Sequence, residues 1–145
     1  MRPVVAGVSA MILYHFTSLY HHLPRIIDSG VLRPSESNVG SPYPEHFPHG
    51  DHVGPDVVWL LDTPDLGGHP HGLAGSSVDK TRVMFTVDVA AVPWVDWLPA
   101  ARMDPRWRDL FISSAGGDDA ARHWYVYPGV IPRRRWLRWE TRETA

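Results

Sequence analysis

The chain has 145 residues, of which 43% are hydrophobic, 21% charged and 11% aromatic, a composition that predicts one compact domain with a substantial core. Its 14 Lys and Arg against 16 Asp and Glu give a net charge of −2, which excludes a strongly basic nucleic-acid coat and a polyacidic disordered tail. The absence of cysteine excludes disulfides, thiolate metal sites and a cysteine nucleophile, and we expect a cytoplasmic protein.

The predicted domain covers residues 11–140. Met11 is an alternative initiator, so we expect residues 1–10 to form a disordered extension, and residues 141–145 are expected to be a tail. No apolar run reaches the roughly 20 residues that cross a bilayer, and no membrane span is therefore expected. The sequence leaves the oligomeric state open.

The first predicted element is a strand over residues 11–17 (MILYHFT), which is rich in aliphatic and aromatic residues. A short helix over residues 24–29 follows. It begins with Pro24, which has no N–H to lose at the first helical position, and it ends at Gly30, which suits a left-handed cap. Residues 31–32 return the chain to the core.

Two long polar loops alternate with two further strands. The loop at residues 33–55 is unusually long for a compact domain, a feature typical of functional or disordered segments. The apolar run 57–61 (VVWLL) predicts a buried strand that ends at a polar turn. After a second polar loop, residues 82–88 (RVMFTVD) alternate with the period of a strand, which places Val83, Phe85 and Val87 on one face.

The last third of the chain contains a segment that covers the core, one helix and two strands. We interpret residues 93–99 as an irregular segment that covers the core with Trp94 and Trp97. Asp104 and Pro105 resemble the start of a helix that ends near Ser114, before two glycines. Residues 123–127 and 136–140 are the last predicted strands. In the final one, the alternation places Leu137 and Trp139 inward and Arg138 and Glu140 outward.

A histidine stands near the end of the first predicted strand, in the run Tyr14-His15-Phe16-Thr17, where an imidazole can exchange hydrogen bonds with a ribose hydroxyl. With the short helix, residues 31–32, the strand at 57–60 and the segment 123–131, this run resembles the ADP-ribosyltransferase-like superfamily. In that superfamily a strand ending in a His-Gly-Thr type motif precedes a short helix and a Gly-Leu segment. The resemblance covers residues 11–140 as an order of elements.

The resemblance points to the small bacterial and phage branches, which include DNA-targeting toxins, rifamycin-type transferases and RNA 2′-phosphotransferases. It implies an α+β fold with a curved, mainly antiparallel, split sheet and short helices. It also implies NAD-dependent ADP-ribosyl transfer to a nucleic-acid, protein or small-molecule acceptor. His15 would then bind the nicotinamide ribose, the backbone at Phe16 and Thr17 would hold the carboxamide, and Tyr20 or Trp59 would stack on the nicotinamide.

The sequence departs from the superfamily at the late strand, where many members carry a glutamate that stabilises the oxocarbenium-like transition state. Here Asp119 or His123 would have to act as the catalytic group. Arg82 is the first candidate for binding the pyrophosphate, with Arg122 and the 133–135 run as others. The missing glutamate leaves two alternatives open, an RNA 2′-phosphotransferase-like enzyme and a catalytically silent domain that binds a nucleotide or a partner.

Two further groups of residues, one of histidines and one of arginines, have side chains that can bind ligands. His46, His49 and His52 have a spacing that would converge on a metal in a helix, but Pro48 and Gly50 oppose that helix, so we interpret them as a solvated loop and expect no metal. The arginine run 133–135 stands with Arg138 beside two tryptophans. We interpret that run as a turn and a strand, with binding of an anion or nucleotide as the alternative.

Overall fold

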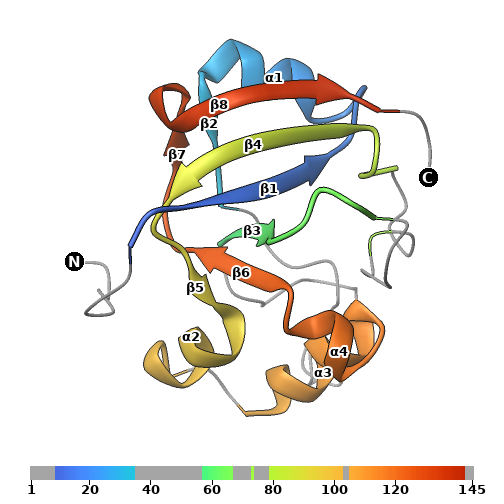
Figure 1. Cartoon of the computed structure of the whole chain (residues 1–145), viewed down its shortest axis with the longest axis vertical. Helices are drawn as coiled ribbons and strands as arrows, with labels where there is room; N and C mark the ends of the chain where they lie inside the picture. The colour runs from blue at the N-terminus through green and yellow to red at the C-terminus, as the bar shows by residue number, and fades with distance from the viewer. Residues whose placement is uncertain (1–8, 35–56, 67–72, 74–78, 103–104, 143–145) are drawn as a thin grey trace, which may run out of the picture.

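The structure is a computed structural model that describes residues 9–34, 57–66, 73, 79–102 and 105–142. Within these ranges the chain is α+β, with a mostly antiparallel sheet and few, short helices (Figure 1). The predicted class is confirmed at this level. Among the described residues, no helix is long and apolar enough to cross a membrane.

The main sheet has six strands in the order β5-β6-β3-β1-β4-β8, and every neighbouring pair is antiparallel. Its central strand β1 pairs with β4 from Met11↔Val89 to Thr17↔Val83, but it registers with β3 only at Tyr14↔Leu61. The strands are β1 (Met11–Thr17), β3 (Val58–Leu61), β4 (Val83–Val89), β5 (Val92–Pro93), β6 (Trp124–Tyr127) and β8 (Trp136–Thr141).

The five strands predicted from the sequence are confirmed to within one residue at each end. The strand β5 was not predicted. Nor was a second, two-stranded sheet, in which β2 (Val31–Leu32) pairs with β7 (Ile131–Pro132). These short strands were missed because two residues are too few to show an alternation of apolar and polar side chains.

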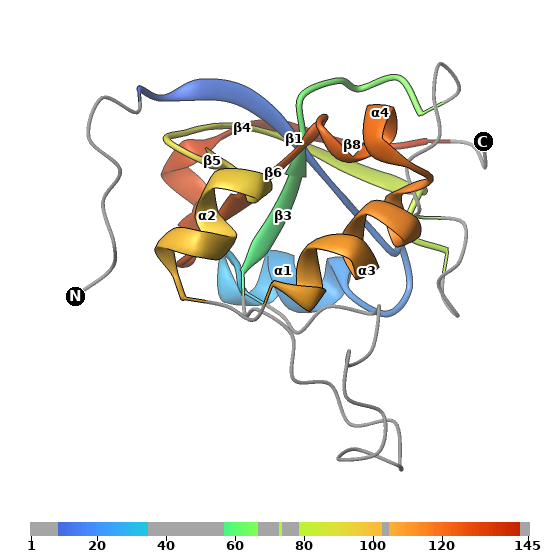
Figure 2. The ribbon, with the colours of Figure 1, turned by 90° about the horizontal axis from the view of Figure 1, so that it is seen from below.

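Both faces of the main sheet pack against other parts of the chain, and the inner strands β3 and β4 are buried on both sides. On one face, Leu13, Leu60 and Phe85 pack with Leu23 of helix α1 (Leu23–Ser29). On the other face, Trp59 and Val126 belong to a cluster formed with the helices α2 (Trp94–Ala100), α3 (Arg106–Ala115) and α4 (Asp118–Ala121), and Figure 2 shows α2 and α3 in front of the sheet. Burial on both faces explains why Met84 and Thr86 of β4 are as inaccessible as Phe85.

The short helix α1 is confirmed, and its left-handed cap is where the sequence placed it. Gly30 has φ of +73°, and its N–H donates to the Ile26 carbonyl over 2.8 Å. The guanidinium of Arg133 caps the same helix end by donating to the Ile27 carbonyl over 2.7 Å.

Replacing Gly30 with alanine is expected to lower the free energy of unfolding by about 1 kcal/mol, because L-residues are strained at positive φ. The nearest atom to an added Cβ would be an Arg133 side-chain atom 3.8 Å away, which is an ordinary contact, so the backbone conformation alone causes the loss. Urea denaturation of the wild type and the Gly30→Ala variant measures this difference. An unchanged midpoint would contradict the strained cap.

The interpretation of residues 93–99 as irregular was wrong, because Trp94–Ala100 forms α2. Pro93 is extended at the N-cap, with φ of −53° and ψ of 133°, and it therefore precedes the helix without disrupting it. Helical spacing then buries Trp94, Trp97 and Leu98 together against α3 and the sheet. The prediction that this segment covers the core with its tryptophans is confirmed.

The final strand differs from its predicted alternation because its register shifts. Val87 pairs with Trp136 and Thr86 pairs with Arg138, so Leu137 lies in a bulge and is 58% exposed. The inward placement of Leu137 was therefore wrong. Trp139 does face the core side, where it stacks on Phe85 with a ring separation of 6.1 Å, although it is 42% exposed.

The predicted helix before the two glycines is α3, which ends at Ala115 with Gly116 in the left-handed region at φ of 105°. Pro105 takes the N-cap position, and the predicted cap Asp104 lies outside the described residues. Residues 1–8 of the expected extension over residues 1–10, and residues 143–145 of the tail, also lie outside them.

Candidate functional site

His15 lies on the central strand, on the face that packs against α1. It pairs with Phe85 across the sheet, and its Nδ1 lies 2.9 Å from the carbonyl oxygen of Trp59 on β3. Burial lowers the pKa of His15 to about 4, and the bond to Trp59 offsets only part of that effect. The ring is therefore neutral near pH 7. Because a carbonyl oxygen can only accept a hydrogen bond, Nδ1 carries the proton and Nε2 has a free lone pair.

Beside His15, the chain that leaves β1 forms a small polar cluster. The Ser18 hydroxyl accepts a hydrogen bond from the backbone N–H of His22 over 3.0 Å and lies 2.5 Å from Nδ1 of the same residue. Ser18 is only 2% exposed, so this contact fixes the His22 ring at the start of α1. The pKa of His22 is lowered, first by burial and then by the positive charge of Lys80.

Lys80 is the third member of this cluster and the only lysine in the chain. It is partly buried just before β4, whose first residue, Val83, pairs with the last residue of β1. Loss of hydration lowers the Lys80 pKa, and its charge lowers the pKa of both His15 and His22. His15 thus offers a neutral imidazole acceptor beside Lys80 and His22, which can both carry a positive charge. This combination is suited to a ligand with hydroxyl and phosphate groups.

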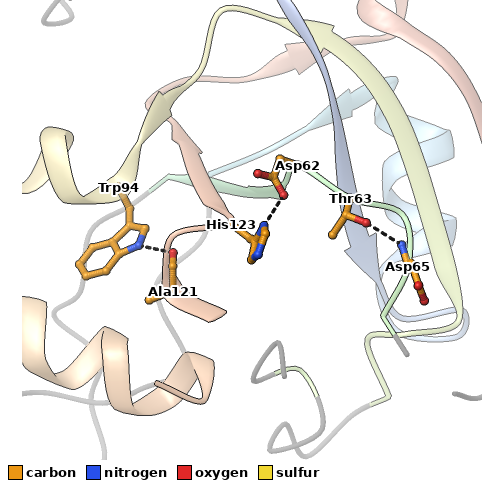
Figure 3. Close-up of polar contacts among 6 residues, drawn as sticks. All are labelled: Asp62, Thr63, Asp65, Trp94, Ala121 and His123. Carbon is orange, nitrogen blue, oxygen red and sulfur yellow. Dashed lines mark hydrogen bonds and ion pairs between the residues drawn. The ribbon is translucent and has the colours of Figure 1, made fainter. Parts of the chain in front are cut away.

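The second predicted histidine, His123, belongs to a different group of residues. Its Nδ1 donates to the carboxylate of Asp62 over 2.8 Å, and the two side chains are 31% and 30% exposed (Figure 3). The Asp62 backbone N–H donates to the His123 carbonyl over 3.1 Å, which extends the β3–β6 ladder by one residue pair. A carboxylate that fixes an imidazole ring in this way is a recurring arrangement in acid–base catalysis.

The structure does not place these two histidines in one constellation. Because β3 runs antiparallel to β1, Asp62 follows the end of β3 that lies beside the first half of β1. Lys80 and His22 lie instead at the other end of β1, beyond Thr17. His15 is therefore joined with Trp59, Lys80 and His22, whereas His123 is joined with Asp62 at the opposite end of the strands.

The residues expected near the nicotinamide are dispersed. Trp59 gives its carbonyl to His15, but its indole lies on the other face of the sheet, against Phe111 at 5.0 Å and Trp124 at 6.1 Å. Phe16 also points to that face, under the Arg142 guanidinium at 5.4 Å. Thr17 is buried on the His15 face, and Tyr20 is 80% exposed. Of the two stacking candidates, only Tyr20 has a ring that is free to meet a ligand.

The remaining charged candidates contact residues outside the His15 cluster. Asp119 is on α4 with 94% of its side chain exposed, where it faces Arg122 at 3.7 Å. Arg82 donates through Nε to the Arg142 carbonyl over 2.8 Å, which ties the start of β4 to the end of the chain's last strand. These contacts indicate structural roles for Arg82 and a solvent-exposed position for Asp119.

The histidine loop at residues 46–52, interpreted above as a solvated loop, lies outside the described residues. Among the residues that the structure describes, no three His, Asp or Glu side chains converge as metal ligands would. In comparisons with known proteins, no family model, no curated protein and no solved structure matches this chain. The site must therefore be interpreted from its own geometry.

Sequence reasoning missed Ser18, His22, Lys80 and Asp62 as partners of the two histidines. One signal was available, since a single lysine among 14 basic residues stands out. Lys80 and Asp62 could not be assigned their partners, because they reach them only through the pairing of strands that are far apart in the sequence.

Proposed function

We propose that this domain binds a dinucleotide of the NAD class at the His15 cluster, formed by His15, Ser18, His22 and Lys80, and that it acts in ADP-ribosyl transfer. The observation that carries the proposal is the state of His15. Its Nδ1–H is held by the Trp59 carbonyl, so the neutral ring offers Nε2 as an acceptor beside Lys80. The order of elements that resembles ADP-ribosyltransferases adds support by analogy only.

The chain's own residues would act in three ways on such a ligand. His15 Nε2 would accept a hydrogen bond from a ribose hydroxyl and thereby orient the sugar. Lys80 and protonated His22 would neutralise a phosphate, and Ser18 would keep the His22 ring in place. The bound dinucleotide would supply a ribose carbon that becomes electrophilic as nicotinamide leaves.

A catalytically silent nucleotide-binding domain is the second candidate, and a specific observation favours it. The two groups expected to serve in place of the missing glutamate, Asp119 and His123, are not part of the His15 cluster. The groups with the largest electrostatic effect on His15 are Lys80 and His22, and neither is a carboxylate. Release of nicotinamide from bound NAD, measured by chromatography, distinguishes transfer or hydrolysis from binding alone.

Isothermal titration with NAD at neutral pH is expected to show binding that takes up protons, because a phosphate near His22 raises a pKa that burial and Lys80 have lowered. The uptake is measured by repeating the titration in two buffers with different ionisation enthalpies. The variants His15→Ala and Lys80→Met should each weaken binding about tenfold or more, the loss expected for a buried or charged hydrogen bond.

The matched control is His21→Ala, since His21 is an exposed histidine next to the cluster. This variant should bind NAD as the wild type does. Lys80→Met keeps the result interpretable if removal of His15 disturbs the core. Absence of heat and of any shift in melting temperature at millimolar NAD would refute the dinucleotide proposal.

A further inference from the structure

The strand β8 leaves one side of the main sheet open. It is the last strand in the sheet order and, within the described part of the chain, it pairs with β4 alone (Figure 1). Five of its six residues are exposed, in contrast to the buried β4 beside it. An edge strand of this kind presents unpaired backbone N–H and C=O groups along its outer side, which can pair with another extended chain.

Positive charge gathers at this edge. The 3₁₀ turn η3 (Arg133–Arg135) leads directly into β8, and Arg134, Arg135 and Arg138 are all exposed. Arg133 instead caps α1 and lies over the Trp136 ring at 5.6 Å. Across residues 133–140 there are four arginines and one acidic residue, Glu140, which lies 3.9 Å from Arg138 with both side chains exposed. A contact this long and this exposed leaves most of the positive charge available.

The same edge carries apolar surface. Leu137 is 58% exposed in the bulge of β8, and Trp139 is 42% exposed while one side of its ring lies on Phe85. Tryptophan and arginine are residue types that are enriched at protein interfaces, and Leu137 adds apolar surface beside them.

From the open edge, its positive charge and its apolar side chains, we propose that β8 docks an acidic, extended peptide segment of a partner protein, which adds to the sheet as a seventh strand. The segment's backbone would pair with the free edge of β8. Its carboxylates would contact Arg134, Arg135 and Arg138, and an apolar side chain would lie against Trp139 or Leu137. This proposal does not depend on the binding of NAD.

Two other molecules could occupy an open edge, and the charge of β8 argues against one of them and its backbone against the other. A second copy paired antiparallel on the centre of β8 would bring its own Arg138 against that of the first, and like charges on facing strands destabilise the pair. A single-stranded nucleic acid would satisfy the arginines and stack on Trp139, but its phosphates offer no N–H donors to the free carbonyl groups of the edge. Only a polypeptide strand is complementary to both the side chains and the backbone.

A library of random decapeptides displayed on phage tests the proposal on the full chain. We expect the wild type to select peptides that are rich in Asp and Glu and poor in proline. The triple variant Arg134→Glu, Arg135→Glu, Arg138→Glu should not select them, and its melting temperature should stay close to that of the wild type because these side chains are exposed. A selection without acidic bias, or one that is identical on the triple variant, would overturn the proposal.

Fluorescence anisotropy with the most enriched peptide then tests the docking mode. A version with proline at two central positions keeps most of the charge but cannot donate those backbone N–H groups, and it should bind at least tenfold more weakly. Trp139→Ala should also weaken binding, whereas Val95→Ala, on an exposed apolar residue of α2, should not. Equal affinity for both peptides, or tighter binding of a thymidine decanucleotide than of the selected peptide, would contradict strand addition.

Discussion

The free energy of unfolding is expected to fall by about 3 kcal/mol between pH 7 and pH 4 through His15 alone. Its pKa is about 4 in the folded protein and 6.5 in an unfolded chain. Between these values the unfolded state binds more protons, so acid favours unfolding and stability increases with pH until about pH 6.5. The loss of free energy is the difference of about 2.5 between the two pKa values multiplied by about 1.4 kcal/mol. It is slightly smaller at pH 4, because His15 is then partly protonated in the folded protein as well.

Urea denaturation at a series of pH values measures this loss, and a His15→Gln variant isolates it from the titration of carboxylates. Glutamine keeps a donor for the Trp59 carbonyl but does not titrate in this range. The variant should be less stable than the wild type at pH 7, and the gap between them should narrow as the pH falls. Parallel pH profiles would show that His15 titrates in the folded protein as it does in the unfolded chain.

Replacing Trp94 with alanine is expected to cost about 4 kcal/mol of unfolding free energy. The indole is 1% exposed in the cluster between the sheet and the helices α2 and α3, and it contacts Phe111 at 5.8 Å. Its removal loses the burial of a large ring and leaves a cavity. It also removes the hydrogen bond from Nε1 to the Ala121 carbonyl, 2.7 Å long, which attaches α2 to α4 (Figure 3).

Two companion variants separate these contributions in urea titrations. Trp94→Phe retains most of the ring and should cost about 1 to 3 kcal/mol, mainly for the carbonyl left without a donor. Trp139→Ala, on a tryptophan that is 42% exposed, should cost clearly less than Trp94→Ala. Equal losses for the two alanine variants would show that burial in this cluster does not govern stability.

The strands and the short helix could be predicted because their signals are local. Residues 82–88 alternate with the period of a strand, and residues 11–17 are rich in aliphatic and aromatic residues. Pro24 and Gly30 mark the two ends of α1. The helix α2 could not be predicted in the same way, since prolines at 93 and 99 suggested an irregular segment. Its tryptophans fold into a helix because tertiary burial outweighs the unfavourable Pro99.

Only part of the candidate site could be predicted from the sequence. His15 could be singled out from its position near the end of a strand, but its hydrogen-bond partner is a backbone carbonyl 44 residues away, which no side-chain pattern encodes. The pairing of His123 with Asp62 follows from the register of β3 and β6. That register, and the face on which each side chain lies, depend on how the strands are arranged in the sheet.

The cap that Arg133 places on α1 has a consequence for the order in which the chain can fold. This hydrogen bond joins residues 106 positions apart, and the pairing of β2 with β7 spans a similar separation. The central strand β1 likewise cannot form its hydrogen bonds to β4 until residues 83–89 have been synthesised. As the chain emerges from the ribosome, its first third therefore lacks its strand partners, and the His15 cluster is completed only once Lys80 has been synthesised. Contacts of such long sequence separation slow folding, and shortening the chain before η3 would remove the cap from the helix that His22 begins.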